Sequence, residues 1–331
     1  MRIEKKEGSQ MTIMHYDLEK IVKDDHVLRG IEKTISFRKI SHDYHDLAKG
    51  TGRKGYGVEV GIRGLFLQFY YDLSDRQIAE RLRYDMAFRW FCGFKIDDPT
   101  PEHSYFSRIR KYLGTKKIGK IFDKIRRKAE SKGIARKVFT FVDASAIKTK
   151  ETTWAERDKA IKESEEALNN ANVEKYSADK DARFGCKGKN KFWYGYKKHT
   201  SVDMGSGLIT NVAVTPANIT DQERLRYICP DGGMVFGDKS YCLSTARMIM
   251  RMNNCHSGAI MKNNMRLKNK DKDKWLTKVR APFENVFSKA DRRTRYRGIA
   301  KVQMQAFMEA IVYNVKRLLV IGSPPLFELG V

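Results

Sequence analysis

Several protein classes are excluded by what the 331-residue sequence lacks. It contains five cysteines, an odd number, and no Cys-x-x-Cys pair, so neither a zinc ribbon nor a disulfide scaffold is expected. No stretch approaches the roughly 18 uncharged apolar residues of a membrane helix. The start of the chain has no apolar segment typical of a signal peptide, and we find no internal repeat. These absences predict a cytoplasmic protein without a membrane partner.

Acidic residues are also in short supply. The chain has 65 Lys and Arg against 40 Asp and Glu, a net charge of +25. A surface this basic repels itself unless an anionic polymer binds it, and nucleic acid is the usual partner. A hydrophobic share of 41% fits a folded protein, and the length predicts about two domains. We therefore expect a folded protein that binds an acidic polymer, most commonly nucleic acid.

The first 135 residues read as helices. Ser74 and Gln77 form a capping-box pattern at the start of one helix, and Thr100-Pro101 opens another with a regular apolar face. The run from Tyr105 to Lys137 holds thirteen basic residues against two acidic ones. It is either a solvated helix face or a phosphate-contacting surface. The arrangement is typical of a helix-turn-helix, although a plain bundle would look the same.

Strand patterns begin at Lys137. The run KVFTFVDAS reads as a buried strand ending at Asp143, and MVFGDKSY as another ending at Asp238. Residues 194–204 and 208–215 alternate on either side of Gly-Ser-Gly and predict a β-hairpin. Helices are expected at about 243–252, 281–294 and 299–320. We predict an α/β fold, compatible with a ribonuclease-H-like mixed sheet. Its domains are a helical one at 1–135 and a catalytic one at 136–325 with an insertion at 151–187.

Three carboxylates suggest the chemistry. Asp143 and Asp238 are expected at strand ends, where α/β sheets usually place their sites. Glu284 is expected to open a helix with Pro282 in its first turn. Carboxylates brought together repel unless divalent cations lie between them, and two such ions support phosphoryl transfer. The plain alternatives are an N-cap role for either aspartate and an ordinary first-turn glutamate.

A family resemblance covers nearly the whole chain. The blocks LSDRQIAERLRYDMAFRWFCGF, PTPEHSYFSRIRKYLG, VDASAIK, YGYKKHTSVDMGSGLITNVAVTPANITDQE, VFGDKSY and VRAPFENVF resemble, in order, those of bacterial insertion-sequence DDE transposases. The resemblance is to the IS-five branch of the broader IS-four-like group. It implies a ribonuclease-H-like fold, Mg²⁺ dependence, and terminal inverted repeats as substrate. It also implies that Asp143, Asp238 and Glu284 are the metal-binding catalytic triad.

The chain departs from one signature of that group, Tyr-x2-Arg-x3-Glu-x6-Lys. Arg280 and Glu284 fit it, but Thr277 stands in place of the Tyr and Asp291 in place of the Lys. Arg292, one position later, could supply the cation, although one residue on a helix turns the side chain by about 100°.

Further residues are candidates for DNA contact. The segment Lys187–Lys198 interleaves lysines with aromatic residues, a mix that grips a backbone and stacks on bases, although the aromatics are as well explained as strand core. The helix after Thr100 is expected to expose Arg108, Arg110 and Lys111, which could read base edges. Lys239 could neutralise the scissile phosphate. The DNA-binding candidates are Arg108, Arg110, Lys111, Lys187, Lys189, Lys191, Lys239, Arg280 and Arg292.

Two features have two interpretations each, and a third, Asp221, has a plain one. The basic segment Lys262–Lys278, with the single aromatic Trp275, reads as an ordered DNA-contacting loop or a disordered linker. His199 could orient a carboxylate or be a satisfied core histidine. Asp221 could simply cap the following helix.

The sequence thus predicts a DNA transposase that acts on double-stranded DNA, both element ends and target. Two Mg²⁺ ions, with Mn²⁺ as a substitute, are expected at the triad, and no small-molecule cofactor. Water would attack at the element's end, and the released 3′-hydroxyl would then attack target DNA. A homodimer on DNA is expected. The rival interpretations are a structure-specific nuclease of the same fold and an inactive DNA-binding derivative.

Overall fold

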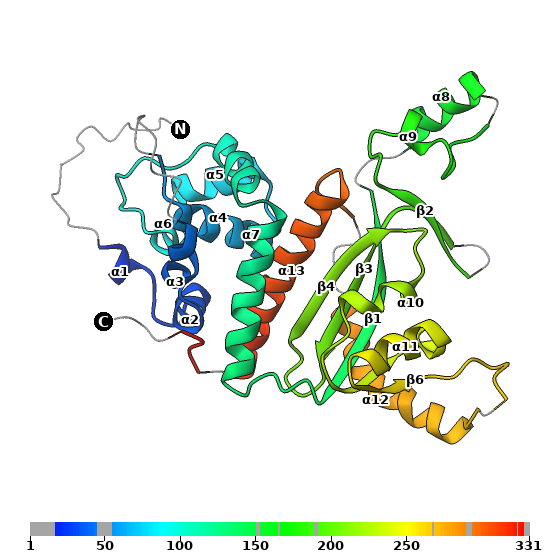
Figure 1. The fold of residues 1–331 in the computed structure, drawn as a ribbon. Coiled ribbons are helices and arrows are strands. Elements are labelled where there is room, and N and C mark those ends of the chain that lie inside the picture. Colours follow the sequence, from blue (N-terminus) through cyan, green and yellow to red (C-terminus); the bar gives the residue numbers. More distant parts are fainter. Residues whose placement is uncertain are drawn as a thin grey trace, which may run out of the picture.

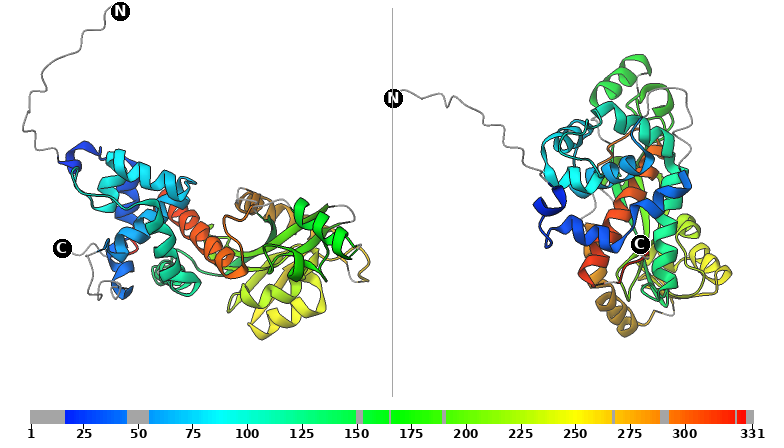
Figure 2. Two further views of the ribbon diagram at one scale, coloured as in Figure 1. Left: turned by 90° about the horizontal axis from the view of Figure 1, so that it is seen from above. Right: turned by 90° about the vertical axis from the view of Figure 1, so that its left-hand side faces the viewer.

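The computed structural model describes residues 17–44, 55–149, 153–164, 166–188, 191–266, 268–288, 293–322 and 324–327 (Figure 1). A helical lobe and a sheet lobe lie on the two sides of the long helix α13 (Ile299–Val320), as Figure 1 and the left-hand view of Figure 2 show. No helix within these ranges is both long and apolar enough to cross a membrane.

The helical lobe contains seven of the described helices. They are α1 (Leu18–Ile21), α2 (Val27–Thr34), α3 (Phe37–Ser41), α4 (Val58–Tyr70), α5 (Asp75–Tyr84), α6 (Met86–Cys92) and α7 (His103–Ser131). The capping box predicted at Ser74 and Gln77 is confirmed, with both reciprocal bonds present. Helix α6 ends at Gly93, whose positive φ of 76° suits glycine. Helix α7 is interrupted at Gly114 by a non-helical φ of 55°.

The sheet has the order β2-β3-β1-β5-β6, with β4 also paired to β3. Strands β3 (Lys191–Asp203) and β4 (Ile209–Pro216) form the predicted hairpin. Strand β1 (Phe139–Lys148) is antiparallel to β3 and parallel to β5 (Gly233–Gly237), which is parallel to β6 (Cys255–Ala259). An antiparallel hairpin that continues into parallel strands is the ribonuclease-H-like mixed sheet that the sequence predicts.

Helices cover both faces of the sheet. Helix α11 (Ser244–Met252) packs on the face of Val142 and Val235, and α12 (Lys270–Ser288) packs on the face of Phe141 and Phe236. Successive residues of a strand point to opposite faces, so the run Phe141-Val142-Asp143 places Asp143 on the α12 face.

The smaller elements lie at the sheet's margins. Helix α10 (Asp221–Arg224) and a 3₁₀ turn (Leu225–Tyr227) precede β5, and a second 3₁₀ turn (Lys239–Cys242) follows it. The insertion contains α8 (Trp154–Ser164), α9 (Val173–Tyr176) and β2 (Arg183–Lys187). Strand β2 pairs with β3, so the end of the insertion is part of the sheet.

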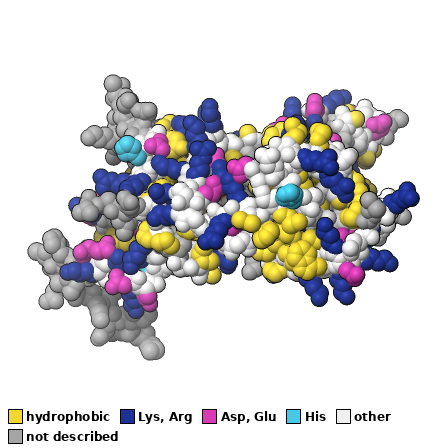
Figure 3. Space-filling view, turned by 60° about the horizontal axis from the view of Figure 1, so that its bottom comes forward, with side chains coloured by type: hydrophobic (Ala, Val, Ile, Leu, Met, Phe, Trp, Pro, Cys, Tyr) yellow, Lys and Arg dark blue, Asp and Glu magenta, His cyan; other side chains and the backbone are white. Residues whose placement is uncertain are grey.

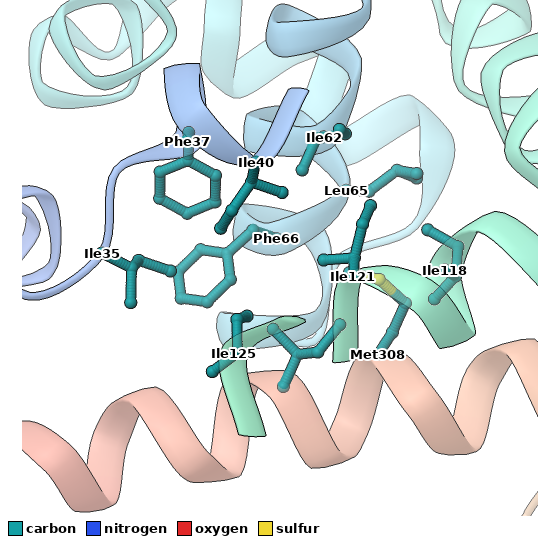
Figure 4. Close-up of a pocket in the computed structure, with 11 residues that line it drawn as sticks. Ile35, Phe37, Ile40, Ile62, Leu65, Phe66, Ile118, Ile121, Ile125 and Met308 are labelled. Carbon is teal, nitrogen blue, oxygen red and sulfur yellow. The ribbon is translucent and has the colours of Figure 1, made fainter. Parts of the chain in front are cut away.

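Helix α13 completes the core of the helical lobe. Met308 and Ile311 from α13 face apolar side chains of α4, α7 and the segment around α3, and Figure 4 shows how these side chains converge. Every residue lining this small space is apolar, so it is packing rather than a ligand site. A buried apolar cluster continues from there along α13 to Val212 and Val214 of β4.

The helix around Pro282 differs from the prediction. It begins at Lys270 rather than near residue 281, and its described part extends to Ser288. Residues 289–292 lie outside the described part of the chain. Asn269 accepts a bond from the Lys272 amide at the start, and Leu276, Val279 and Phe283 give the helix one apolar face against the sheet. Pro282 therefore lies inside the helix, and Glu284 does not open it.

Gly195 in β3 has a backbone conformation that other residues rarely adopt. Gly195 has a φ of +152°, and a Cβ there would lie 2.2 Å from the Ile147 carbonyl oxygen of β1. We expect Gly195→Ala to lower the free energy of unfolding by about 1–3 kcal/mol from backbone strain alone. Gly232→Ala is the matched control, because no atom lies within 4 Å of its Cβ position. Urea denaturation measures both variants, and equal losses would contradict the prediction.

Candidate active site

The parallel pairing of β1 with β5 positions two carboxylates. The last pair of that ladder is Phe141 with Phe236, and Asp143 and Asp238 each lie two residues further along their strands. Both aspartates therefore stand at the same level, just past the carboxyl end of β5. Strand β1 itself does not end at Asp143, as the sequence suggests, because it continues to Lys148 along β3. Only the pairing with β5 ends before it.

The pKa of the Asp143 carboxyl group is raised above its ordinary value. Burial, with a smaller contribution from the nearby negative charge of Asp238, raises the pKa of Asp143 from 3.8 to about 6. The hydrogen bond from the Ala144 amide, 2.8 Å long, and the positive charges of Lys187 and Arg280 oppose this rise in pKa. The ionised form of Asp143 therefore favours further positive charge at this place.

Asp238 is held by the turn that follows it. It is the N-cap of the 3₁₀ turn Lys239–Cys242, and its Oδ1 accepts bonds from the Ser240 amide at 2.8 Å and the Ser240 hydroxyl at 2.5 Å. The capping role considered from the sequence is therefore real for Asp238. Both bonds use the same oxygen, so capping also fixes the carboxylate's orientation beside Asp143.

The position of the third carboxylate, that of Glu284, remains a prediction from the sequence. Glu284 lies on α12, and its side chain is outside the described part of the chain. Its neighbour Phe283 packs near Phe141, with 6.4 Å between ring centroids, so α12 passes over the face of the sheet that carries Asp143. Arg280, one turn earlier, is buried with its guanidinium 5.2 Å from the Phe141 ring. Arg292 lies outside the described residues.

The pair of aspartates suits a hard cation. Mg²⁺ and similar ions prefer carboxylate oxygens, and two carboxylates near each other gain from a shared positive ion. Among the side chains that the structure describes, no group of three or more His, Cys, Asp or Glu residues has a metal-binding arrangement. Glu284 is not among those side chains.

The lysine-rich segment of β2 and β3 divides into two kinds of residue. Lys187 and Lys191 face each other across the strands and are both exposed, whereas Lys189 lies outside the described residues. Lys197 and Lys198 are instead bound to Asp221 at 2.9 Å and to Glu309 at 2.7 Å.

The aromatics of that segment divide in the same way. Phe192 is exposed, and Trp193, Tyr194 and Tyr196 are buried. Most of the aromatics are therefore strand core, which is the second of the two interpretations.

Helix α7 corrects one DNA-binding candidate. Arg108 and Lys111 are exposed as expected. The guanidinium of Arg110 instead pairs with both Asp75 oxygens, at 2.7 and 2.5 Å, and lies over the Tyr296 ring at 5.2 Å. The expectation that Arg110 is exposed is wrong, because an acidic partner on α5 draws it inward. Lys239, beside Asp238, is exposed.

His199 is a core histidine. It is fully buried, pairs with Ala144 rather than Asp143 across the strands, and lies 2.9 Å from the Thr215 hydroxyl. Burial lowers the pKa of His199 to about 3, so the ring is neutral. Asp221 lies in the first turn of α10 after its cap Thr220 and pairs with Lys197. Asp221 is thus an ion-pair partner and not the cap.

Tyr241 is a residue that sequence reasoning missed. Its ring is fully buried against Gly237, and its hydroxyl has no partner among the described atoms. Burial, and then the charges of Asp221, Asp143 and Asp238, raise the pKa of Tyr241 well above its ordinary value. The only signal in the sequence is its place three residues after Asp238.

The metal-free protein should be stabilised by Asp143→Asn. Since the folded-state pKa of Asp143 is about 6 against an ordinary 3.8, the folded form binds the proton more tightly, and stability rises as the pH falls from 6 to 4. At 1.36 kcal/mol per pH unit, ionised Asp143 costs up to about 3 kcal/mol at pH 8. Asp143→Asn should remove that cost at pH 8 and have no effect below pH 4. Denaturation with chelator across this pH range checks it, and a pH-independent difference would contradict it.

Two known protein families match parts of this sequence. Residues 16–112 match the family described as Transposase domain (DUF772), and residues 134–315, more than half of the chain, match Transposase DDE domain.

Two solved structures are similar over most of the chain. The piggyBac transposase synaptic complex with hairpin DNA has 10% identity and a TM-score of 0.39, covering 89% of this chain and 74% of that one. The Mos1 transposase paired-end complex with left transposon end has 8% identity and a TM-score of 0.19, covering 88% and 87%. On the strength of the sequence match over residues 134–315, the chain belongs to the transposase DDE domain family.

Proposed function

We propose that this DNA transposase uses Asp143, Asp238 and Glu284 to cleave the ends of an insertion sequence of the IS-five type and to join them to target DNA. The observation that carries the proposal is the register of β1 with β5, which puts Asp143 and Asp238 at one level of the sheet. The raised pKa of Asp143 supports it, because a perturbed carboxyl group beside a second one is typical of a catalytic site.

The proposed metal is Mg²⁺, as two ions, with Mn²⁺ as a substitute. When bound, such ions would activate the attacking oxygen and stabilise the leaving oxygen. The chain's part is to hold the carboxylates in place through the Ala144 amide and Ser240. Arg280 and Lys187, whose charges act on Asp143, would offset the negative charge of the phosphates.

The proposed reaction has two steps at one site. Water attacks the phosphodiester at the element's end, breaks the bond from phosphorus to the 3′-oxygen and so releases a 3′-hydroxyl. This hydroxyl then attacks a phosphodiester of the target strand and displaces the 3′-oxygen of the neighbouring target nucleotide. In both steps the protein positions the reacting oxygen and neutralises charge, without a covalent enzyme intermediate.

The proposed DNA contacts are of two kinds. Arg108 and Lys111, exposed on α7, would read the terminal inverted repeats, since arginine can contact base edges. Lys187, Lys189, Lys191 and Lys239 would contact phosphates, which position DNA without reading it. Arg292 is proposed for the same task. A homodimer that holds both ends of the element, in the nucleoid, completes the proposal.

The triad is tested by Asp143→Ala, Asp238→Ala and Glu284→Ala. Each should reduce Mg²⁺-dependent nicking and strand transfer of an end fragment by at least about a hundredfold, since metal ligands stabilise several kcal/mol of transition-state charge. Binding of the same fragment should change little. Glu223→Ala on α10, an exposed carboxylate, is the matched control. Near wild-type nicking by any of the three variants would remove that residue from the triad.

The two kinds of contact are separated by competition binding at fixed salt. Arg108→Ala should lower the preference for an element end over scrambled DNA by on the order of 1–3 kcal/mol.

Replacing Lys187 and Lys191 with alanine should weaken binding to both DNAs equally. It should also flatten the dependence of log affinity on log salt by about 0.9 for each phosphate that the protein no longer neutralises. Lys159→Ala on α8, an exposed lysine that already pairs with Glu163 at 3.7 Å, is the control. If the preference survives the arginine change and falls with the lysine changes, the recognition surface lies in the sheet lobe.

A further inference from the structure

Three aromatic rings lie next to one another, from the start of β1, the end of β5 and helix α12. The Phe139 and Phe236 ring centroids are 5.9 Å apart, and those of Phe236 and Trp275 are 6.4 Å apart. The middle ring, Phe236, is 2% exposed, whereas Phe139 is 51% exposed and Trp275 on α12 is 54% exposed. The buried ring therefore holds two outer rings that present large apolar surfaces to solvent.

This surface needs an explanation, because large exposed aromatic patches are usually binding sites. Val138, next to Phe139, is also exposed. On the side of the sheet lobe that Figure 3 brings forward, hydrophobic side chains gather in one patch, with Lys and Arg side chains around it. The basic segment around Trp275, whose role the sequence left open, is thus partly the ordered start of α12.

Two cations lie beside Trp275 on α12. Lys274 and Lys278 are exposed on α12, and no ion pair joins either of them to an acidic residue in the described ranges. Nearby Lys268, in contrast, pairs with Asp273 at 3.5 Å. An aromatic surface between unpaired lysines favours a polyanion that carries flat rings, and it disfavours a second copy of a chain with net charge +25.

Unpaired nucleotides fit this description better than duplex DNA. In a duplex the base faces are stacked on one another, whereas a single strand exposes them to aromatic side chains. We propose that Phe139 and Trp275, with Lys274 and Lys278, bind unpaired nucleotides of a DNA strand, the rings stacking on bases and the lysines contacting phosphates.

The location links this site to the proposed chemistry. Trp275 precedes Glu284 by nine residues of one helix, about 13 Å. Phe139 precedes Asp143 by four residues of one strand, also about 13 Å. Helix α12 and strand β1 therefore both run from the aromatic rings toward the proposed triad. The inference that the bound strand is the one being cut rests on the proposed function, but the binding itself does not.

Binding of the full-length protein to a short labelled oligothymidylate tests the site. Trp275→Ala should weaken binding about tenfold, because a base would lose its stacking on the aromatic side chain. The salt dependence should stay unchanged, because a ring neutralises no phosphate. Changing Lys274 and Lys278 to alanine should flatten the salt dependence. Trp275→Phe should restore most of the affinity, which a purely structural defect would not predict.

Trp154 provides a matched control, because it is an exposed tryptophan on α8, 61% exposed. Trp154→Ala should leave binding unchanged. Oligothymidylate should quench tryptophan fluorescence in the wild type and in Trp154→Ala, and the quenching should be lost in Trp275→Ala.

Two results would overturn the proposal. One is unchanged oligothymidylate affinity in both Trp275→Ala and Phe139→Ala. The other is a change confined to sedimentation, which would make the patch a contact between copies of the chain. Failure of the proposed function would look different: the triad variants would nick normally while oligothymidylate binding still depended on Trp275.

Discussion

The register between β1 and β5 is the constraint on which the candidate site depends. It stops the ladder at Phe141 and Phe236, so that Asp143 and Asp238 follow at one level, on strands far apart in the sequence. The arrangement brings two negative charges together in a partly buried place, and the raised pKa of Asp143 reports its cost. A fold that keeps such a repulsive pair has a reason to bind cations there, because a bound cation would turn the repulsion into a favourable interaction.

Helix α13 connects the sheet, in which this register is set, to the helical lobe. On the sheet side, Asn314 bonds both the amide and the carbonyl of Ile209, and Glu309 pairs with Lys198. On the other side, Phe307 packs against Phe122 of α7. A helix near the end of the sequence thus belongs to the cores of both lobes. The boundary at residue 135 divides the chain by composition, but the packing joins α7, with its exposed Arg108, to the sheet that carries the aspartates.

Local sequence patterns predict the elements that are determined by interactions between residues close together in the sequence. The β3–β4 hairpin and the start of α5 follow from alternation and from the Ser74 capping box, and both are present. The start of α12 could not be predicted in the same way. Pro282 is typical of a first helical turn, and only the packing of Leu276 and Val279 on the sheet shows that the helix starts twelve residues earlier. Arg110 likewise reads as exposed until Asp75, from another helix, is placed beside it.

The same reasoning explains where the positive charge is available for DNA. A buried or half-buried cation needs an acidic partner or, like Arg89, backbone carbonyl oxygens that accept its hydrogen bonds, because an unpaired charge is costly away from water. Acidic residues supply such partners inside the fold. Asp75 pairs with Arg110, Asp221 with Lys197 and Glu309 with Lys198. With 40 acidic residues against 65 basic ones, the excess cations must stay at the surface. Exposed cations without an acidic partner among the described residues therefore mark the surface open to phosphate better than the number of lysines in any segment. They include Arg108, Lys111, Lys187, Lys191, Lys239, Lys274 and Lys278.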